Sequence, residues 1–399
     1  MYNPDTVQRL RERPRIWVHA VSVGEIYVAM RFMEELRAGD PETAFVLTTT
    51  TSTGHRIAET KLNAADVLLY FPSDFPFIIN RVLNILKPTA LILTESELWP
   101  NLIRGARSRN IPVILINGRI SESSHKGYRL LRVFFRRIVR SIDLLLVQTR
   151  QDEQRLLDLG ADQGNIRVMG TAKYDIAQFD SVGEKFTREL LKTVGFDSDS
   201  LIIVGGSTWP GEESILLDVY KRLREDTERL KLVLVPRHAE RRVEVEAEIV
   251  KRGLRHIRRS EIGRQIGEKV APEILLVDTT GELKNFYACA SVIFVGKSLT
   301  SHGGQNIIEA ALFGKPIVIG PNMENFPDVT SDFLSANAII QVQDANGLEQ
   351  AFRSLLEEKD LREAYGRHAS EVVWEKKGVV HASIEFIFEI MNNRKMNLP

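Results

Sequence analysis

Short runs of apolar residues alternate with longer amphipathic stretches along the whole chain. In the first half, each run is four or five residues long and is apolar at almost every position. Because neither face of such a run is polar, the pattern is typical of strands in a parallel sheet that is covered on both sides. The predicted strands are 16–20, 45–49, 67–70, 91–94, 113–116 and 144–148. The stretches between them, such as 26–38 and 77–86, have the spacing of helices.

The same alternation starts again in the second half of the chain. The predicted strands there are 201–205, 232–235, 274–277, 292–295 and 317–319. A polar stretch over 175–199 separates the two sets and predicts a boundary between domains 1–178 and 179–399. Strands that alternate with helices favour an α/β fold of two Rossmann-like parallel-sheet domains. We expect these domains to face each other across a cleft, with ligands at the carboxyl ends of the strands.

Composition excludes several classes of protein. Lys plus Arg and Asp plus Glu both number 53, so no overall charge favours nucleic acid. The first fifteen residues lack the apolar core of a signal peptide, and no run approaches the ~20 apolar residues of a membrane span. The single Cys289 has no partner for a disulfide. These features predict a cytoplasmic protein whose membrane contact, if any, is peripheral. P-loop, G-x-G-x-x-G, HExxH and CxxC motifs are absent.

In the first half, candidate catalytic residues follow the predicted strands. Glu25 follows strand 16–20 at the start of a helix, where it is either a first-turn glutamate favoured by the helix dipole or a general base. Glu95 and Glu97 follow strand 91–94, and Glu95 is the stronger functional candidate, although either can cap the next helix. Lys173 is either a solvated surface charge or a cation that neutralises a donor carboxylate or phosphate.

In the second half, the candidates suit an anionic ligand. Arg237 and His238 end strand 232–235, and an arginine fork suits phosphate. The segment Gly281, Glu282 and Leu283 is explained as well by a helix start as by a ligand site. In the segment 301–309, Gly303 and Gly304 predict backbone amides that approach an anion at a helix N-terminus. Asn306 and Glu309 fit either a capping box or a nucleotide site in which Glu309 accepts hydrogen bonds from the ribose hydroxyls.

Residues 119–140 hold seven basic residues and one acid. On a single helix, Arg129, Arg132, Arg136 and Arg140 would share one face, and Leu130, Leu131, Phe134, Phe135 and Ile138 would share another. The segment is either a half-buried helix with a solvated basic face or a surface that meets anionic lipid headgroups. The second interpretation predicts that Arg132, Arg136 and Arg140 face lipid.

Taken together, these segments resemble the family of 3-deoxy-D-manno-octulosonic acid (Kdo) transferases of lipopolysaccharide synthesis. The matching segments are HAVSVGE, TESELWPN, NGRIS, GTAKYD, PRH, GEL, GGQNIIEAALFGKP and GPNMENF, in order between residues 19 and 326. The resemblance implies a GT-B fold in which the last helix often packs back on the N-terminal domain. It implies that residues 1–178 bind the acceptor and 179–399 the donor. The reaction is then an inverting transfer of Kdo from CMP-Kdo to a lipid A precursor, lipid IVA, without metal or cofactor, at the cytoplasmic face of the bacterial inner membrane.

The resemblance also implies a role for each matching residue. Glu25 corresponds to the catalytic base, and Glu95 and Lys173 to positions that stabilise the transition state. The residues that correspond to the site for the CMP part of the donor are Arg237, His238, Gly281, Glu282, Leu283, Asn306, Ile307, Ile308 and Glu309.

The chain departs from the family pattern at Gln305, Lys297 and Ile307, where His, Gly and Pro are usual, and it has only fifteen residues where a hydrophobic anchor commonly precedes the first strand. The alternatives are another GT-B transferase with a different donor or acceptor, a sugar-nucleotide epimerase, and a degenerate nucleotide-sugar binding protein. Retention of Glu25, Glu95, Lys173 and Arg237 argues against the last, and Glu25 with the basic segment argues against the epimerase.

Overall fold

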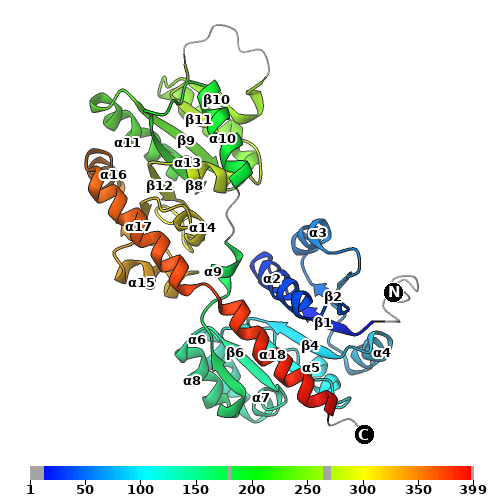
Figure 1. Cartoon of the computed structure of the whole chain (residues 1–399). Coiled ribbons are helices and arrows are strands. Elements are labelled where there is room, and N and C mark those ends of the chain that lie inside the picture. Colours follow the sequence, from blue (N-terminus) through cyan, green and yellow to red (C-terminus); the bar gives the residue numbers. More distant parts are fainter. Residues whose placement is uncertain (1–12, 178–180, 264–270, 397–399) are drawn as a thin grey trace. The chain divides into compact units, whose positions relative to one another are not determined.

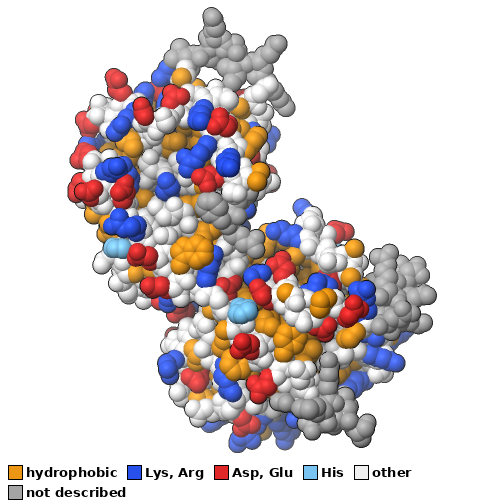
Figure 2. Space-filling model, in the orientation of Figure 1, with side chains coloured by type: hydrophobic (Ala, Val, Ile, Leu, Met, Phe, Trp, Pro, Cys, Tyr) orange, Lys and Arg blue, Asp and Glu red, His pale blue; other side chains and the backbone are white. Residues whose placement is uncertain are grey.

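The computed structural model describes residues 13–177, 181–263 and 271–396, and it forms two compact units (Figure 1). Unit 1 contains the chain up to Ile176 and again from Lys376, and unit 2 contains Ala177 to Glu375. The predicted domain boundary between residues 178 and 179 lies outside the described residues. Figure 2 shows acidic and basic side chains mixed over the visible face of each unit.

Unit 1 is built on a parallel sheet of seven strands in the order β3-β2-β1-β4-β5-β6-β7. Its strands are β1 (Arg15–His19), β2 (Ala44–Thr49), β3 (Val67–Tyr70), β4 (Ala90–Thr94), β5 (Val113–Gly118), β6 (Leu144–Val147) and β7 (Ile166–Val168). Its helices are α2 (Val23–Gly39), α3 (Ser52–Lys61), α4 (Pro76–Leu86), α5 (Pro100–Arg107), α6 (Glu122–Leu130), α7 (Arg132–Val139), α8 (Arg150–Leu159), α9 (Lys173–Ile176) and α18 (Val379–Met396), with a 3-10 turn η1 (Gln163–Asn165).

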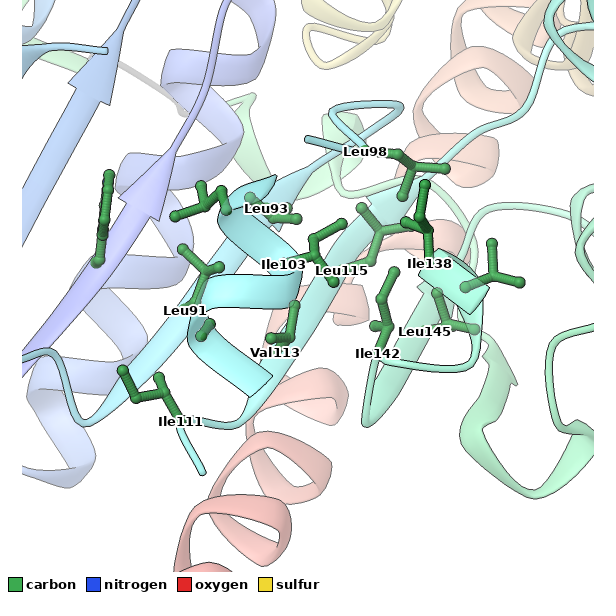
Figure 3. Close-up of a cluster of buried hydrophobic side chains, with 14 of the residues drawn as sticks. Leu91, Leu93, Leu98, Ile103, Ile111, Val113, Leu115, Ile138, Ile142 and Leu145 are labelled. Carbon is green, nitrogen blue, oxygen red and sulfur yellow. The ribbon is translucent and has the colours of Figure 1, made fainter. Parts of the chain in front are cut away.

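Two apolar cores cover the two faces of this sheet. On one face, α4, α5, α7 and α8 pack against alternate strand residues such as Leu91, Leu115 and Leu145 (Figure 3). On the other face, α2, α3 and α18 pack against the intervening residues, such as Ile92 and Ile114. This alternation explains why the strands are apolar at consecutive positions, because each residue enters one core or the other.

The last helix, α18, closes the second of these cores with side chains such as Val380 and Ile387. Asp175 holds its N-terminus, because the carboxylate accepts hydrogen bonds from the Gly378 N–H at 2.6 Å and the Val380 N–H at 2.7 Å. A carboxylate at a helix start also meets the positive end of the helix dipole. Within the described residues, no helix has both the length and the apolar character needed to cross a bilayer.

Unit 2 repeats the architecture, with strand order β10-β11-β9-β8-β12-β13-β14, all parallel. Its strands are β8 (Leu201–Thr208), β9 (Leu230–Pro236), β10 (His256–Arg258), β11 (Ile274–Leu276), β12 (Val292–Val295), β13 (Ile317–Ile319) and β14 (Ile339–Gln341). Its helices are α10 (Ser181–Thr193), α11 (Glu212–Asp226), α12 (Arg242–Lys251), α13 (Leu283–Cys289), α14 (Ile308–Ala311), α15 (Pro327–Ser335), α16 (Ala345–Glu357) and α17 (Lys359–Lys376), with 3-10 turns η2 (Ala239–Arg241) and η3 (Arg259–Glu261). The structure confirms the expected class of two Rossmann-like parallel-sheet domains.

Three strands were not predicted: β7, β10 and β14. Each has only three residues and lies at the edge of its sheet. Edge strands are partly exposed, so they lack the continuous apolar run by which the inner strands are recognised. The basic segment 119–140 also differs from the expected single helix, because α6 and α7 are separated at Leu131, whose backbone is not helical.

Candidate functional site

Each sheet has a position where the strand order reverses, and the segments that follow the strands at that position carry Glu25, Glu95 and residues 306–309. In unit 1 this position lies between β1 and β4, and in unit 2 between β8 and β12. Open parallel sheets bind ligands outside the carboxyl ends of the strands at such a switch point. The loop after β1 leads to Glu25, and the loop after β4 begins with Glu95. The switch point of each unit is therefore its candidate site.

Glu25 lies in the first turn of α2 and closes a capping box with Ser22. Its carboxylate accepts hydrogen bonds from the Val21 N–H at 2.9 Å and the Ser22 N–H at 3.3 Å. A third bond, of 2.9 Å, comes from the Thr94 hydroxyl at the end of β4. Its 7% exposure leaves little of it at the surface. Glu25 therefore joins the loops after β1 and β4, as expected of a first-turn glutamate, and it lies beside the other carboxylates of the switch point.

Glu95 and Lys173 are brought together by Asn117, at the end of β5. The Asn117 amide donates to Glu95 Oε1 at 3.1 Å, and its carbonyl oxygen accepts the Ala172 N–H at 3.0 Å. Lys173 Nζ lies 3.9 Å from Glu95 Oε1. Burial raises the pKa of Glu95, while the positive charge of Lys173 opposes the rise and Glu25 adds to it. The backbone of Glu95 has a φ of 50°, which a non-glycine residue rarely adopts outside functional sites and tight turns.

His19 and Glu97 complete the unit 1 cluster, although the sequence did not indicate a catalytic role for either. Burial, together with the nearby charges of Glu25 and Glu95, raises the pKa of Glu97 to about 7, against the effect of a hydrogen bond from Trp99. His19 is fully buried and stacks on Phe71, and its Nε2 lies 3.9 Å from Glu97 Oε2. Burial lowers the pKa of His19 to about 4, so the ring is neutral at pH 7.

In unit 2, Arg237 and His238 follow β9 with exposed side chains, as the sequence predicted. The His238 ring meets the Trp209 ring edge to face, with centroids 5.8 Å apart. Glu309 is also exposed, but the surrounding protein raises the pKa of its carboxyl group, and the positive charges of Arg237 and Lys284 oppose that rise. The structure thus brings Arg237 and Glu309 within electrostatic reach of each other.

The other predicted donor residues are held by the fold. Glu282 accepts hydrogen bonds from Arg259 at 2.8 and 3.1 Å and from Thr279, and it precedes α13, which begins at Leu283. Gly281, before it, has a φ of 87° and is exposed. The Asn306 side chain accepts the Ile308 N–H at 3.0 Å, which is not the capping box with Glu309 that was one of the two alternatives. Both isoleucines, 307 and 308, are fully buried, so neither presents a side chain to a donor.

Glu212 was missed from sequence, although it occupies in unit 2 the place of Glu25 in unit 1. It lies in the first turn of α11 with 0% exposure. Its carboxylate accepts the Trp209 N–H at 2.9 Å and the N–H groups of Lys297, Ser298 and Leu299 at 2.8, 2.9 and 2.9 Å. The signal that could have found it is its position after the central strand of the second half, as Glu25 follows that of the first.

Each half of the chain matches a known protein family. Residues 3–176 match the family model for 3-deoxy-D-manno-octulosonic-acid transferase, and residues 270–372 match that for glycosyl transferases group 1. A 3-deoxy-D-manno-octulosonic acid transferase of Haemophilus influenzae is 32% identical over 93% of this chain and 86% of its own length. One from Bordetella pertussis is 34% identical over 89% of this chain and 82% of its own length.

Solved structures agree on the fold. A glycosyltransferase from Rickettsia africae matches 97% of this chain and 100% of its own with a TM-score of 0.61 at 13% identity. A UDP-GlcNAc 2-epimerase from Neisseria meningitidis matches 94% of this chain and 100% of its own with a TM-score of 0.57 at 14% identity. The fold is therefore GT-B. Because homologues from this family match most of its length, the chain belongs to the family of 3-deoxy-D-manno-octulosonic acid transferases and is a glycosyltransferase.

Proposed function

We propose that this enzyme transfers Kdo from CMP-Kdo to a lipid A precursor, lipid IVA, with inversion at the anomeric carbon. The acceptor hydroxyl oxygen attacks that carbon while its bond to the phosphate oxygen breaks. The hydroxyl proton moves to a carboxylate, and CMP leaves with the bonding electron pair. The observation that carries the proposal is the cluster of Glu25, Glu95, Glu97 and Lys173 at the switch point of unit 1, in a chain of this family.

Glu25 is the base in this proposal. A general base must come within hydrogen-bond reach of the proton that it takes. Glu25 Oε2 accepts both the Val21 N–H and the Thr94 hydroxyl, whereas Oε1 accepts the Ser22 N–H at 3.3 Å, so Oε1 is the oxygen with a lone pair left to take the proton. Lys173 is paired with Glu95. Its ammonium group stabilises the negative charges of the Kdo carboxylate and the leaving phosphate as the bond between sugar and phosphate breaks. Glu97 is the neighbour whose raised pKa makes it the competing base.

In this proposal the donor binds to unit 2, and the support is that Arg237 and His238 are exposed after β9 and that the charge of Arg237 acts on Glu309. A guanidinium binds a phosphate through two parallel hydrogen bonds. Arg237 therefore stabilises the monophosphate as it leaves, Glu309 accepts hydrogen bonds from ribose hydroxyls, and no metal is required.

The acceptor is a lipid, and α6 and α7 offer a surface that suits an anionic membrane. Leu130, Leu131 and Phe134 are 86%, 60% and 51% exposed, so only the later part of the predicted apolar face, with the buried Ile138, enters the core. The arginines of α7 lie among them, and Figure 2 shows Lys and Arg side chains along the lower edge of unit 1, where Figure 1 places α7. Exposed apolar groups beside arginines are typical of segments that lie in a membrane interface. We propose peripheral binding there, on the cytoplasmic side of the inner membrane.

The test is a transfer assay. Wild-type protein is incubated with CMP-Kdo and the tetraacyl lipid A precursor, and lipid product and free CMP are measured together. The proposal predicts equal amounts of both, and no CMP release above the spontaneous rate when the acceptor is left out. A CMP-linked sugar acid other than Kdo serves as the donor control. Release of CMP without lipid product, or product only from another donor, would contradict the proposed reaction.

A further inference from the structure

The loop after β12 holds a lysine in a backbone conformation that favours glycine. Lys297 has a φ of 58°, in the left-handed region that strains a residue with a Cβ. Its N–H is bound by the buried carboxylate of Glu212, which also binds the Trp209 N–H from the loop after β8. One carboxylate thus fixes both loops of the unit 2 switch point. Strain that is held in place by buried groups at such a position is typical of functional sites.

The Lys297 side chain extends over the Trp209 indole, with Nζ 4.6 Å from the ring centroid. An ammonium group over an indole face is attracted by the ring, which holds the charge near one position without neutralising it. Trp209 Nε1 is buried, and among the described residues it has no hydrogen-bond partner. The same ring meets His238 on the neighbouring loop. The Lys297 ammonium group and the Trp209 N–H, which has no partner among the described residues, therefore lie close together in the loops that follow the neighbouring strands β8 and β12.

The nearby glycine loop does not offer the amides that the sequence suggested. The Gly303 N–H donates to Glu324 Oε2 at 2.6 Å, and the Gly304 N–H donates to the Lys297 carbonyl oxygen at 2.9 Å. Both amides are used inside the protein, so neither is free to bind an anion in this structure. Lys297 Nζ lies 3.4 Å from the point that a Cβ on Gly303 would occupy. The Lys297 ammonium group thus lies close to the loop whose amides were expected to bind the anion.

We propose that Lys297, held on Trp209, is an oxyanion-binding residue for the donor at the unit 2 switch point. The inference rests on the proposed function, because it takes the oxyanion from CMP-Kdo. That donor carries two anionic groups, the phosphate and the carboxylate of the sugar acid, and an ammonium group binds either.

Binding measurements on three variants separate charge from fold. Lys297→Gly removes the ammonium group and relieves the left-handed strain, so it should fold at least as stably as wild type. Lys297→Met removes the charge and keeps the length, and Lys297→Arg keeps the charge. Lys221→Met, on the exposed face of α11, removes one charge elsewhere on unit 2. The ligands are cytidine, CMP and CMP-Kdo, with calorimetry for the first two and KM for the third.

If Lys297 binds the phosphate, the Gly and Met variants should bind CMP about 10- to 100-fold more weakly, the range for a charged hydrogen bond, and cytidine equally well. If it binds the carboxylate, CMP affinity should stay and KM for CMP-Kdo should rise by a similar factor. The CMP affinity of Lys297→Arg and its KM for CMP-Kdo should both stay within a few-fold of the wild-type values. The proposal is overturned if both neutral variants keep CMP affinity and KM within twofold, or if Lys221→Met loses as much.

Failure of the proposed function is seen separately, in a wild-type protein that neither binds CMP nor consumes CMP-Kdo. In that case inorganic pyrophosphate serves as the oxyanion probe, with Trp209 fluorescence as the readout. Quenching by pyrophosphate that is lost in Lys297→Met and in Trp209→Phe would support an oxyanion site for another donor. Equal quenching in wild type and Lys297→Met would refute it.

Discussion

The switch points of the two units share a backbone plan and differ in charge. In each, the helix after the central strand has a buried glutamate in its first turn, Glu25 in unit 1 and Glu212 in unit 2. Glu212 accepts four backbone N–H groups from two loops, whereas Glu25 accepts two N–H groups and a hydroxyl. Around Glu25 lie further carboxylates, and around the unit 2 switch point lie Arg237, His238 and Lys297.

The comparison shows that a first-turn glutamate at this position holds loops together whether or not it does chemistry. Burial and hydrogen bonds alone therefore do not single out Glu25 as a base. What distinguishes Glu25 is that it accepts the Thr94 hydroxyl itself and lies near the Glu95–Lys173 pair and Glu97, whose pKa is raised. In unit 2, the Thr208 hydroxyl and the ion pair with Arg241 are made by Glu213 and not by Glu212. A chemical role for Glu25 and a purely structural role for Glu212 can be tested by the same kind of substitution.

Replacing Glu25 with Gln should have the largest effect on turnover. The amide cannot accept the hydroxyl proton, so the transfer rate should fall by about 10²–10⁴-fold, while CMP affinity in unit 2 stays unchanged. Glu34→Gln, on the exposed side of α2, is the matched control. If Glu25→Gln turned over near the wild-type rate with the same pH profile, Glu25 would be a loop-holding residue like Glu212.

Replacing Glu212 with Ala should have the largest effect on stability. It leaves four backbone N–H groups without their acceptor in a buried place, which should lower the free energy of unfolding by about 3–5 kcal/mol in urea. Glu225→Ala, exposed on the same helix, should change it by less than about 0.5 kcal/mol. Equal unfolding curves for the two variants would show that the loops of unit 2 are held in another way.

The surface of unit 1 offers a smaller effect. Arg140 donates to the Gly160 carbonyl oxygen at 2.9 Å, so Arg137 replaces it in a triple Ala variant with Arg132 and Arg136. Each basic residue near an anionic bilayer contributes about 1 kcal/mol, so binding to anionic vesicles should weaken by roughly 100-fold at low salt, with CMP affinity intact. The control removes the exposed lysines 221, 251 and 359 of unit 2. Wild-type protein that ignores the vesicles, or a control that loses as much, would leave α7 an ordinary solvated surface.

The smallest effect concerns pH. The folded pKa of Glu97, about 7, is raised above its ordinary value of 4.5, so the stability that this group contributes is present below pH 4.5 and is lost as pH rises to about 7. Glu97→Gln cannot ionise and should be more stable than wild type above pH 7, with the difference in Tm shrinking towards pH 5. His19 titrates in both proteins, so the comparison between them removes its contribution. A difference in Tm that does not vary with pH would show that Glu97 is not strained by ionisation in the fold.

The sequence predicted the inner strands and the positions of Glu25, Glu95 and Arg237 because long apolar runs and strand ends are local patterns. It did not predict the exposure of Leu130 and Phe134, since helical periodicity says only that they share a face. It also missed the hydrogen bond from the Lys297 N–H to Glu212, which spans 85 positions and depends on the pairing of β8 with β12. The pKa of Glu97 escaped for the same reason, because burial is a tertiary property.

The return of α18 to unit 1 has a consequence for the order of folding. Unit 2 is inserted between two segments of unit 1, because the chain leaves unit 1 after Ile176 and re-enters it at Lys376. During synthesis from the N-terminus, the sheet of unit 1 emerges first, but the helix that covers one of its faces is made about two hundred residues later. Unit 2 can complete its own core in that interval. The apolar face that includes Ile92 and Ile114 must meanwhile wait partly uncovered, and it is the surface that a chaperone would recognise in a nascent or truncated chain.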